Sequence, residues 1–191
     1  MRLRTAAPAA LALATALALT GCSGPTAGHD TMPGMGTTQN EITDANQADV
    51  MFTAMMIPHH EQAIEMSDVL LAKSDIDPEV ADLAERIKAA QGPEIEQMKG
   101  WLDDWGVTEM PDTMGHGGMM DEGDMDALAA ASGAEASRLF LEQMIEHHEG
   151  AIDMAEDALA DGENADVLEL ARTIIDAQTA EIAEMQGMLA R

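Results

Sequence analysis

The chain has 191 residues, 36 acidic against nine basic side chains, a formal net charge of −27 at pH 7, 17 methionines and one cysteine. Such an excess of negative charge excludes nucleic acid as a partner, and a lone cysteine excludes disulfides within the chain. Stability must therefore come from a helical core or from bound metal. The acidic residues are spread along the sequence, which favours a solvated surface as their main role and attraction of cations as a second one.

The first 21 residues are typical of a secretory signal. Arg2 and Arg4 precede an Ala/Leu-rich run that ends at Leu19 and is too short for a membrane-spanning helix. Leu-Thr-Gly directly precedes Cys22, which looks like the bacterial lipoprotein pattern, in which that thiol is lipidated and becomes the mature N-terminus. We therefore expect an extracytoplasmic protein that is attached to the cell membrane through lipid on Cys22. Residues 22–40, rich in Gly, Thr and Pro, are expected to be a flexible tether.

The remaining residues, 41–191, contain four long helical segments and a short one. Asn46 is a good cap for a first helix that ends near Lys73, and Pro78 is a good first-turn residue for the second. The expected ranges are 46–73, 78–105, 124–131, 134–160 and 164–190, with a Met- and Gly-rich linker over 106–123. Unit one thus covers about 46–105 and unit two about 134–190.

The two units are related by an internal duplication. The block Phe52–Met66 returns 88 residues later as Phe140–Met154, with Phe, Met, Ile, a His-His pair and Ala at matching places. The second helices match at an offset of 87. Each unit is therefore a helical hairpin that cannot bury its apolar stripe alone. The predicted fold is all-α, a four-helix bundle built from two duplicated antiparallel hairpins plus a short linker helix, because no stretch alternates with a period of two.

The repeated residues resemble a known family, the ferritin-like "domain of unknown function" family number 305. The likeness covers about residues 41–190. Its motifs are Met-Ile-Pro-His-His-Glu-Gln-Ala at 56–63, the matching block at 144–154, and Gln-x-x-Glu-Ile-x-x-Met at 91–98 and 178–185. The resemblance implies a ferritin-like bundle. Because some extracytoplasmic members are associated with binding copper or silver, it also implies these ions as candidate ligands.

Helical periodicity predicts a polar layer inside the bundle. His59 falls on the inward stripe of its helix, His60 falls at the edge of that stripe, and Gln91 and Glu94 fall on the buried face of the second helix at about the same level. Repetition predicts an equivalent layer from His147, His148, Gln178 and Glu181. Burying such groups without partners is costly, so they must satisfy one another or a bound ion.

Two interpretations of this layer stay open at the level of sequence. In the first, His59–Glu94 and His147–Glu181 pairs only fix the register of the helices. In the second, the Gln and Glu side chains orient imidazoles that bind a metal. A di-iron centre needs Glu three residues before each histidine, but the chain has Met56 and Met144 there, which favours soft Cu(I) or Ag(I). The candidate ligands are His59, His60, Met55, Met56, Met66, His147, His148, Met144 and Met154, and the candidate orienting groups are Gln91, Glu94, Gln178 and Glu181.

Methionines and histidines outside the long helices form a second group of candidates. For any single helical methionine, filling of the core is the simpler role, but methionines in loops are expected to pack against nothing. Gly-rich segments with paired Met and His can wrap a soft ion, although compositional drift could also produce them. These candidates are His29, Met32 and Met35 in the tether, and Met114, His116, Met119 and Met120 in the linker.

The sequence thus predicts a lipid-anchored protein that binds or buffers soft metal ions, with copper or silver as the bound ion. No catalytic turnover is expected, because neither a triad-like nucleophile nor a phosphate-binding glycine loop is present. The alternative is a non-metal interaction module of the cell envelope whose His/Glu/Gln network is structural, and a metal-dependent oxidase is the third reading. Pro58 and Pro93 occur only in unit one, where they predict kinks and favour unit one as the working site. The sequence does not indicate which protein would be a partner.

Overall fold

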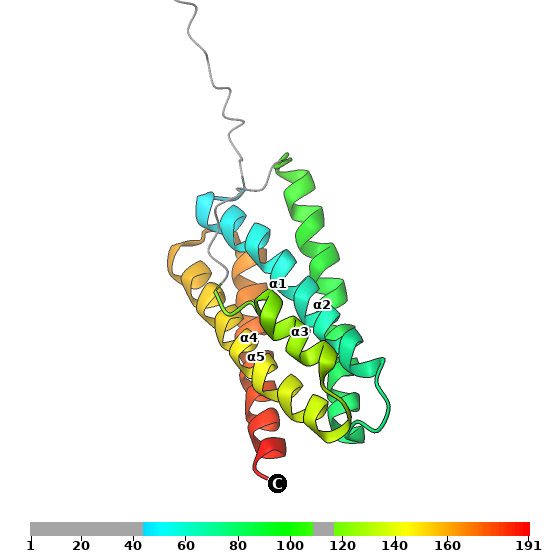
Figure 1. The fold of residues 1–191 in the computed structure, drawn as a ribbon. Coiled ribbons are helices and arrows are strands. Elements are labelled where there is room, and N and C mark those ends of the chain that lie inside the picture. Colours follow the sequence, from blue (N-terminus) through cyan, green and yellow to red (C-terminus); the bar gives the residue numbers. More distant parts are fainter. Residues whose placement is uncertain (1–43, 109–116) are drawn as a thin grey trace, which may run out of the picture. The chain divides into compact units, whose positions relative to one another are not determined.

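The computed structural model describes residues 44–108 and 117–191, which form five α-helices and no strand. The helices are α1 (Gln47–Leu71), α2 (Pro78–Asp104), α3 (Glu122–Ala130), α4 (Gly133–Asp161) and α5 (Ala165–Leu189). The predicted all-α bundle of two antiparallel hairpins with a short linker helix is confirmed (Figure 1). None of the described helices combines the length and the apolar character that crossing a membrane requires.

Short polar residues define where the helices begin. Asn46 and Asp49 form a capping box at the start of α1, in which each side chain accepts a hydrogen bond from the other's backbone N–H. Asp77 caps α2 ahead of Pro78, and Asn164 caps α5 by accepting from the backbone N–H groups of two first-turn residues. These local signals fix the length of each hairpin, and so they set which residues of its two helices lie at the same level.

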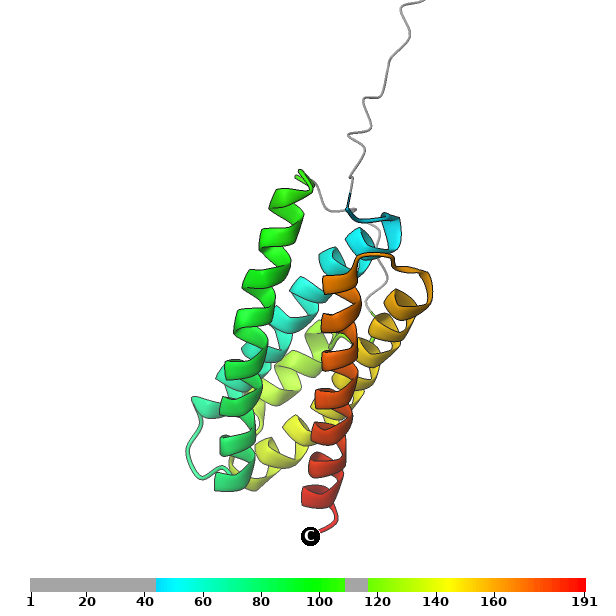
Figure 2. The ribbon, with the colours of Figure 1, turned by 180° about the vertical axis from the view of Figure 1, so that it is seen from behind.

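The two hairpins pack mainly through their first helices. α1 lies against α2, α4 lies against α5, and the contact between the hairpins is made chiefly by α1 and α4. The short helix α3 lies over α1 and α4 on the face shown in Figure 1, whereas α2 and α5 occupy the opposite face, which is nearest the viewer in Figure 2. Residues at the α1–α4 contact are therefore at the centre of the molecule.

The apolar core is divided into two clusters by a polar level. One cluster contains buried residues from before the His-His pair of α1 and from after that of α4, and the other cluster contains the reverse. Met56, Ile95, Ala151 and Ile174 belong to the first, and Ala63, Ile87, Met144 and Met185 belong to the second. The four histidines of the repeated motif thus lie between two apolar layers, which exclude water from above and below.

Each hairpin also holds the turn of the other. Asp49 in α1 is fully buried and accepts hydrogen bonds from the backbone N–H groups of Glu163 (3.1 Å) and Asn164 (3.1 Å) in the α4–α5 turn. At the equivalent position of the duplicate, Ser137 in α4 accepts a hydrogen bond of 2.9 Å from the backbone N–H of Asp77 in the α1–α2 turn. These paired bonds lock the register of the two hairpins.

Part of the predicted linker is packed against the bundle. Gln62 of α1 makes two hydrogen bonds to the backbone of Met120, donating to its carbonyl (2.9 Å) and accepting from its N–H (2.8 Å). The chain at Gly118 then passes so close to α4 that a Cβ on Gly150 would lie 2.5 Å from the Gly118 Cα. Gln62 and Gly150 are equivalent positions of the duplication, so the two units differ where this segment crosses them.

Both prolines of unit one lie inside helices. α1 and α2 are each one continuous helix through Pro58 and Pro93, and both proline side chains are exposed on the outside of the bundle. A helix can carry a proline on its solvent face because water can satisfy the freed carbonyl. The preference for unit one as the working unit stays a prediction, and each unit contributes two buried histidines to the central level.

Candidate metal centre

His59 of α1 and His147 of α4 meet at the centre of the bundle. Their ring centroids are 3.7 Å apart and their planes are inclined by 41°. The two side chains are 1% and 0% exposed, and none of their four ring nitrogens has a hydrogen-bond partner in the protein. A buried polar group without a partner costs about 1–3 kcal/mol, so this arrangement is unfavourable unless something else satisfies the nitrogens.

The neighbouring histidines have a different environment. Nε2 of His60 donates to a Glu94 oxygen at 2.7 Å, and Nε2 of His148 donates to a Glu181 oxygen at the same distance. The predicted His59–Glu94 and His147–Glu181 pairs are therefore wrong by one residue. Consecutive residues of a helix point about 100° apart, so the first histidine of each pair faces the other hairpin and the second faces its own. His60 is also fully buried rather than at an edge.

The Gln and Glu residues of the layer also differ from each other in their environment. Gln91 and Gln178 are buried, and the side-chain oxygen of each has no hydrogen-bond partner in the protein. The Glu94 and Glu181 side chains were expected on the buried face, but they are 20% and 17% exposed. The two carboxylates therefore reach from solvent to a buried imidazole. That geometry lowers the cost of burial, because water still hydrates part of each charge.

Burial keeps the central imidazoles neutral. The pKa of His59 is lowered from 6.5 to about 3, first by burial and then by the nearby His60 and His148. The carbonyl of Gly117 opposes this shift but is not placed for a hydrogen bond. Burial likewise holds the pKa of His147 well below 6.5, and His59 adds to the effect. Neutral imidazole with a free lone pair is the form that binds metal ions.

Two buried methionines flank the paired imidazoles. Met56 and Met144 are fully buried and stand three residues before His59 and His147, a spacing that places side chains next to each other on a helix. Met66 is also buried but lies about two turns from His59, and Met55 and Met154 are only partly buried. Within residues 44–108 and 117–191, no three His, Cys, Asp or Glu side chains converge on a metal position. The potential metal ligands at the centre of the bundle are thus two imidazoles with nearby thioethers.

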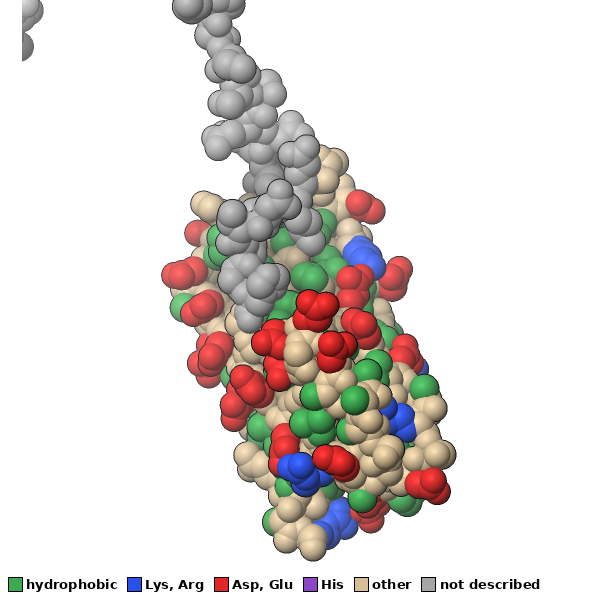
Figure 3. Space-filling model, in the orientation of Figure 1, with side chains coloured by type: hydrophobic (Ala, Val, Ile, Leu, Met, Phe, Trp, Pro, Cys, Tyr) green, Lys and Arg blue, Asp and Glu red, His purple; other side chains and the backbone are tan. Residues whose placement is uncertain are grey.

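The structure describes only some of the candidate metal ligands outside the long helices. His29, Met32, Met35, Met114, His116 and Cys22 lie outside the described residues. Met120 is buried in the same apolar cluster as Met144, and Met119 is partly buried, so the expectation that linker methionines pack against nothing is wrong for both. Among the residues that Figure 3 colours by type, no histidine is visible on the face shown, which agrees with the burial of all four described histidines.

Comparison with known proteins identifies the family. The family model described as "Domain of unknown function (DUF305)" matches residues 49–189, which include both hairpins. The chain belongs to the DUF305 family. The resemblance inferred from the repeated motif is thereby confirmed. No curated protein matches the chain.

Solved structures of similar proteins have the same fold. A DUF305 fragment from Deinococcus radiodurans is 33% identical, with a TM-score of 0.70 over 77% of this chain and 98% of that one. A DUF305 protein from Streptomyces coelicolor is also 33% identical, with a TM-score of 0.71 over 75% and 92%. CopM in a Cu(I)-bound form is 36% identical, with a TM-score of 0.63 over 73% and 94%, and CopM has also been solved in Cu(II)-bound, Ag-bound and apo forms.

Proposed function

We propose that this protein binds soft metal ions, Cu(I) or Ag(I), at the paired imidazoles of His59 and His147 and holds them without catalytic turnover. The observation that carries this proposal is the set of four buried ring nitrogens without partners. A register-setting network accounts for His60 and His148, whose Nε2 atoms are bonded to glutamates. It does not account for the central pair, because two unsatisfied imidazoles weaken a core that apolar side chains would fill better.

The chemistry of the surrounding groups favours a soft ion. Met56 and Met144 supply thioethers one helical turn from the central imidazoles, and thioether and imidazole together suit Cu(I). The apolar layers on both sides exclude water, which protects a reduced ion from solvent. The structures of the similar protein CopM with Cu(I), Cu(II) and silver support a metal site in a bundle of this fold.

Titration of the purified protein with Cu(I), against a competing chelator under anaerobic conditions, tests the proposal. We expect tight binding by the wild type and a loss of about 100-fold or more in affinity for the His59→Leu and His147→Leu variants. Removing a group that merely supports a ligand already costs 10–100-fold, and removing a ligand should cost at least as much. Leucine keeps the volume of the buried side chain, so the bundle is expected to fold, which circular dichroism would verify.

Methionine substitutions give a matched control for this titration. Met56→Leu with Met144→Leu removes the thioethers next to the histidines and should weaken Cu(I) binding by about tenfold. Met98→Leu with Met185→Leu removes two equally buried thioethers from α2 and α5 and should leave the affinity unchanged. Wild-type affinity in both histidine variants would overturn the proposed site. An effect of the control pair equal to that of the first pair would show that general packing, rather than coordination, is responsible.

We also infer that the protein is extracytoplasmic and is anchored to the cell membrane by lipid on Cys22. The signal-like residues 1–21 and the position of Cys22 support this inference. A Cys22→Ser variant, expressed in its native host, is expected to move from the membrane fraction to the soluble extracytoplasmic fraction and to lose incorporation of a labelled fatty acid. Persistence of the variant in the membrane fraction, with the label still incorporated, would contradict the inference.

A further inference from the structure

The duplication creates two equivalent grooves between α2 and α5, the two helices nearest the viewer in Figure 2. The first groove has a volume of about 260 Å³, and its lining residues include Glu94, Gln97, Asp166, Glu169 and Thr173. The second has a volume of about 500 Å³, and its lining residues include Glu79, Asp82, Arg86, Glu184 and Arg191. At the offset of 87 residues, the positions 79, 82, 86 and 97 of the chain correspond to 166, 169, 173 and 184.

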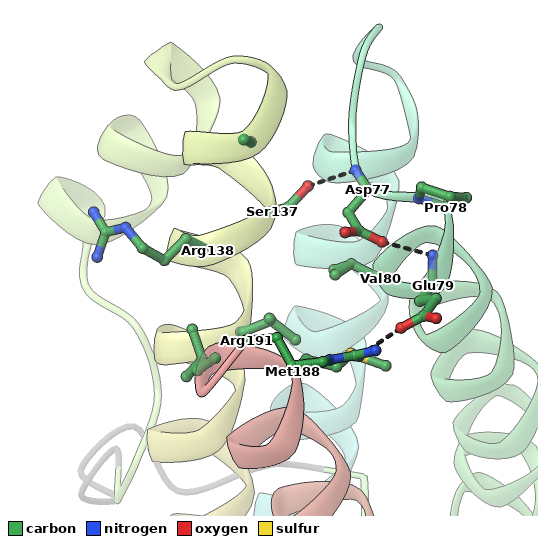
Figure 4. Close-up of a pocket in the computed structure, with 11 residues that line it drawn as sticks. Asp77, Pro78, Glu79, Val80, Ser137, Arg138, Met188 and Arg191 are labelled. Atoms are coloured by element: carbon green, nitrogen blue, oxygen red, sulfur yellow. Dashed lines mark hydrogen bonds and ion pairs between the residues drawn. The ribbon is translucent and has the colours of Figure 1, made fainter.

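The two grooves differ in their balance of charge. In the second groove, Arg86 pairs with Glu184 at 2.6 Å and Arg191 pairs with Glu79 at 2.5 Å, a contact that Figure 4 shows at the end of the bundle. In the first groove, Thr173 stands where Arg86 would be, and none of the six described residues that line it is basic. No described arginine lines the first groove, whereas two of the three carboxylates that line the second, Glu79 and Glu184, are paired with arginines.

The first groove leads to the buried histidines through one hydrogen bond. Glu94 lines the groove, and its carboxylate accepts the 2.7 Å hydrogen bond from Nε2 of His60, whose side chain has no exposed surface. Nδ1 of His60 is buried and has no partner in the protein. His60 directly follows His59 in α1. Glu94 and His60 thus lead from solvent at the groove to the buried level that holds the unpartnered central imidazoles.

We propose that this first groove is the entry port through which a monovalent soft cation reaches the histidine centre, with Glu94 and His60 as the transfer point. The proposal rests on the function proposed above and assigns the route by which the metal ion enters. Asp166 and Glu169 attract the cation and raise its local concentration. Oxygen ligands match a soft ion poorly, so the carboxylates do not retain it, and the imidazoles inside draw it onward. In the second groove, the two arginines pair with two of the three carboxylates and so weaken the attraction for a cation.

The rate of metal uptake distinguishes a port from a binding site. Apo-protein is mixed anaerobically with the cationic tetrakis(acetonitrile) complex of Cu(I), and copper that has not been taken up is captured with bicinchoninate after set times and read by its colour. We expect the Asp166→Asn/Glu169→Gln variant to load about fivefold more slowly than wild type at low ionic strength. Its equilibrium affinity should change less than twofold, because the central imidazoles are intact. Added salt should reduce the difference in rate.

The second groove supplies the matched control. Glu79→Gln/Asp82→Asn removes the same two charges from the equivalent positions of α2, so it changes the overall field of the protein equally. This control is expected to load at the wild-type rate. Equal slowing in both variants, or no slowing in either, with tight binding preserved, would overturn the port and leave the proposed function standing. Absence of tight Cu(I) binding by the wild type would instead overturn the proposed function, and the port with it.

Discussion

Between pH 7 and pH 5, the metal-free bundle is expected to lose about 2 kcal/mol of stability through His59 alone. The pKa of His59 falls from 6.5 to about 3 when the chain folds, so below pH 6.5 the unfolded chain binds a proton that the folded chain does not. Stability therefore rises with pH in this range, is fully present above pH 6.5, and is lost progressively as the pH falls towards 3. His147 acts in the same direction, because burial also lowers its pKa. Urea denaturation of the apo-protein at each pH measures the loss.

A double variant separates this effect from the general charge of the chain. Acidification also protonates carboxylates and relieves the repulsion within a protein of net charge −27, which favours the folded state. His59→Leu/His147→Leu keeps all the carboxylates and removes only the central imidazoles. We expect its stability to change less between pH 7 and pH 5 than that of wild type. A pH dependence as steep in the double variant as in wild type would show that other groups are responsible.

The duplication made the fold predictable. A repeat of Phe, Met, Ile, His-His and Ala at helical spacing can be buried only if two hairpins pack together, and Asn46, Pro78 and Asn164 mark where helices begin. These signals are local, so sequence alone reveals them. Which residues of α1 lie opposite which residues of α4 is a different kind of information. It depends on the Asp49 and Ser137 bonds between the hairpins, and no local pattern predicts those.

The same distinction explains the outcome for the candidate site. Periodicity placed His59 and His147 inside the bundle, and both are buried. Periodicity describes each hairpin by itself, and it therefore pairs each of these histidines with the glutamate of its own hairpin. In the structure, the first histidine of each pair contacts its counterpart in the other hairpin. The second histidine of each pair makes the hydrogen bond to the glutamate. The expected pair was wrong because an error of one residue on a helix turns a side chain by about 100°.

Differences between the two units indicate where the duplicated bundle became asymmetric. The histidines, their glutamates and the neighbouring methionines are the same in both units, so the central layer has kept its twofold character. Gln62 against Gly150 and Arg86 against Thr173 differ, and these positions meet the linker segment and line the grooves. The centre is thus shared, whereas access to it differs between the two sides of the bundle. This is the pattern expected of one site that is loaded from one side.

Loss of the Asp49 carboxylate is expected to cost the largest amount of stability of any single side chain at the bundle end. Asp49 is fully buried and accepts hydrogen bonds from the backbone N–H groups of Asn46, Glu163 and Asn164. In an Asp49→Ala variant three donors lose their acceptor, at about 1 kcal/mol each, so the free energy of unfolding should fall by about 3 kcal/mol. Urea denaturation at pH 7 measures it. Removing one negative charge from so acidic a chain would by itself be neutral or favourable, so the expected loss cannot come from net charge.

Two further variants test whether this loss comes from the lock between hairpins. Ser137→Ala removes the equivalent bond in the duplicate, a single neutral hydrogen bond to the Asp77 N–H, and should cost about 1 kcal/mol. Glu156→Ala removes an exposed acid from α4 and should leave stability within about 0.5 kcal/mol of wild type. Because Asp49 and Ser137 hold opposite turns of the same interface, their combined loss should loosen the contact that brings His59 and His147 together. Additive losses with unchanged Cu(I) affinity would show that the α1–α4 contact keeps its register without them.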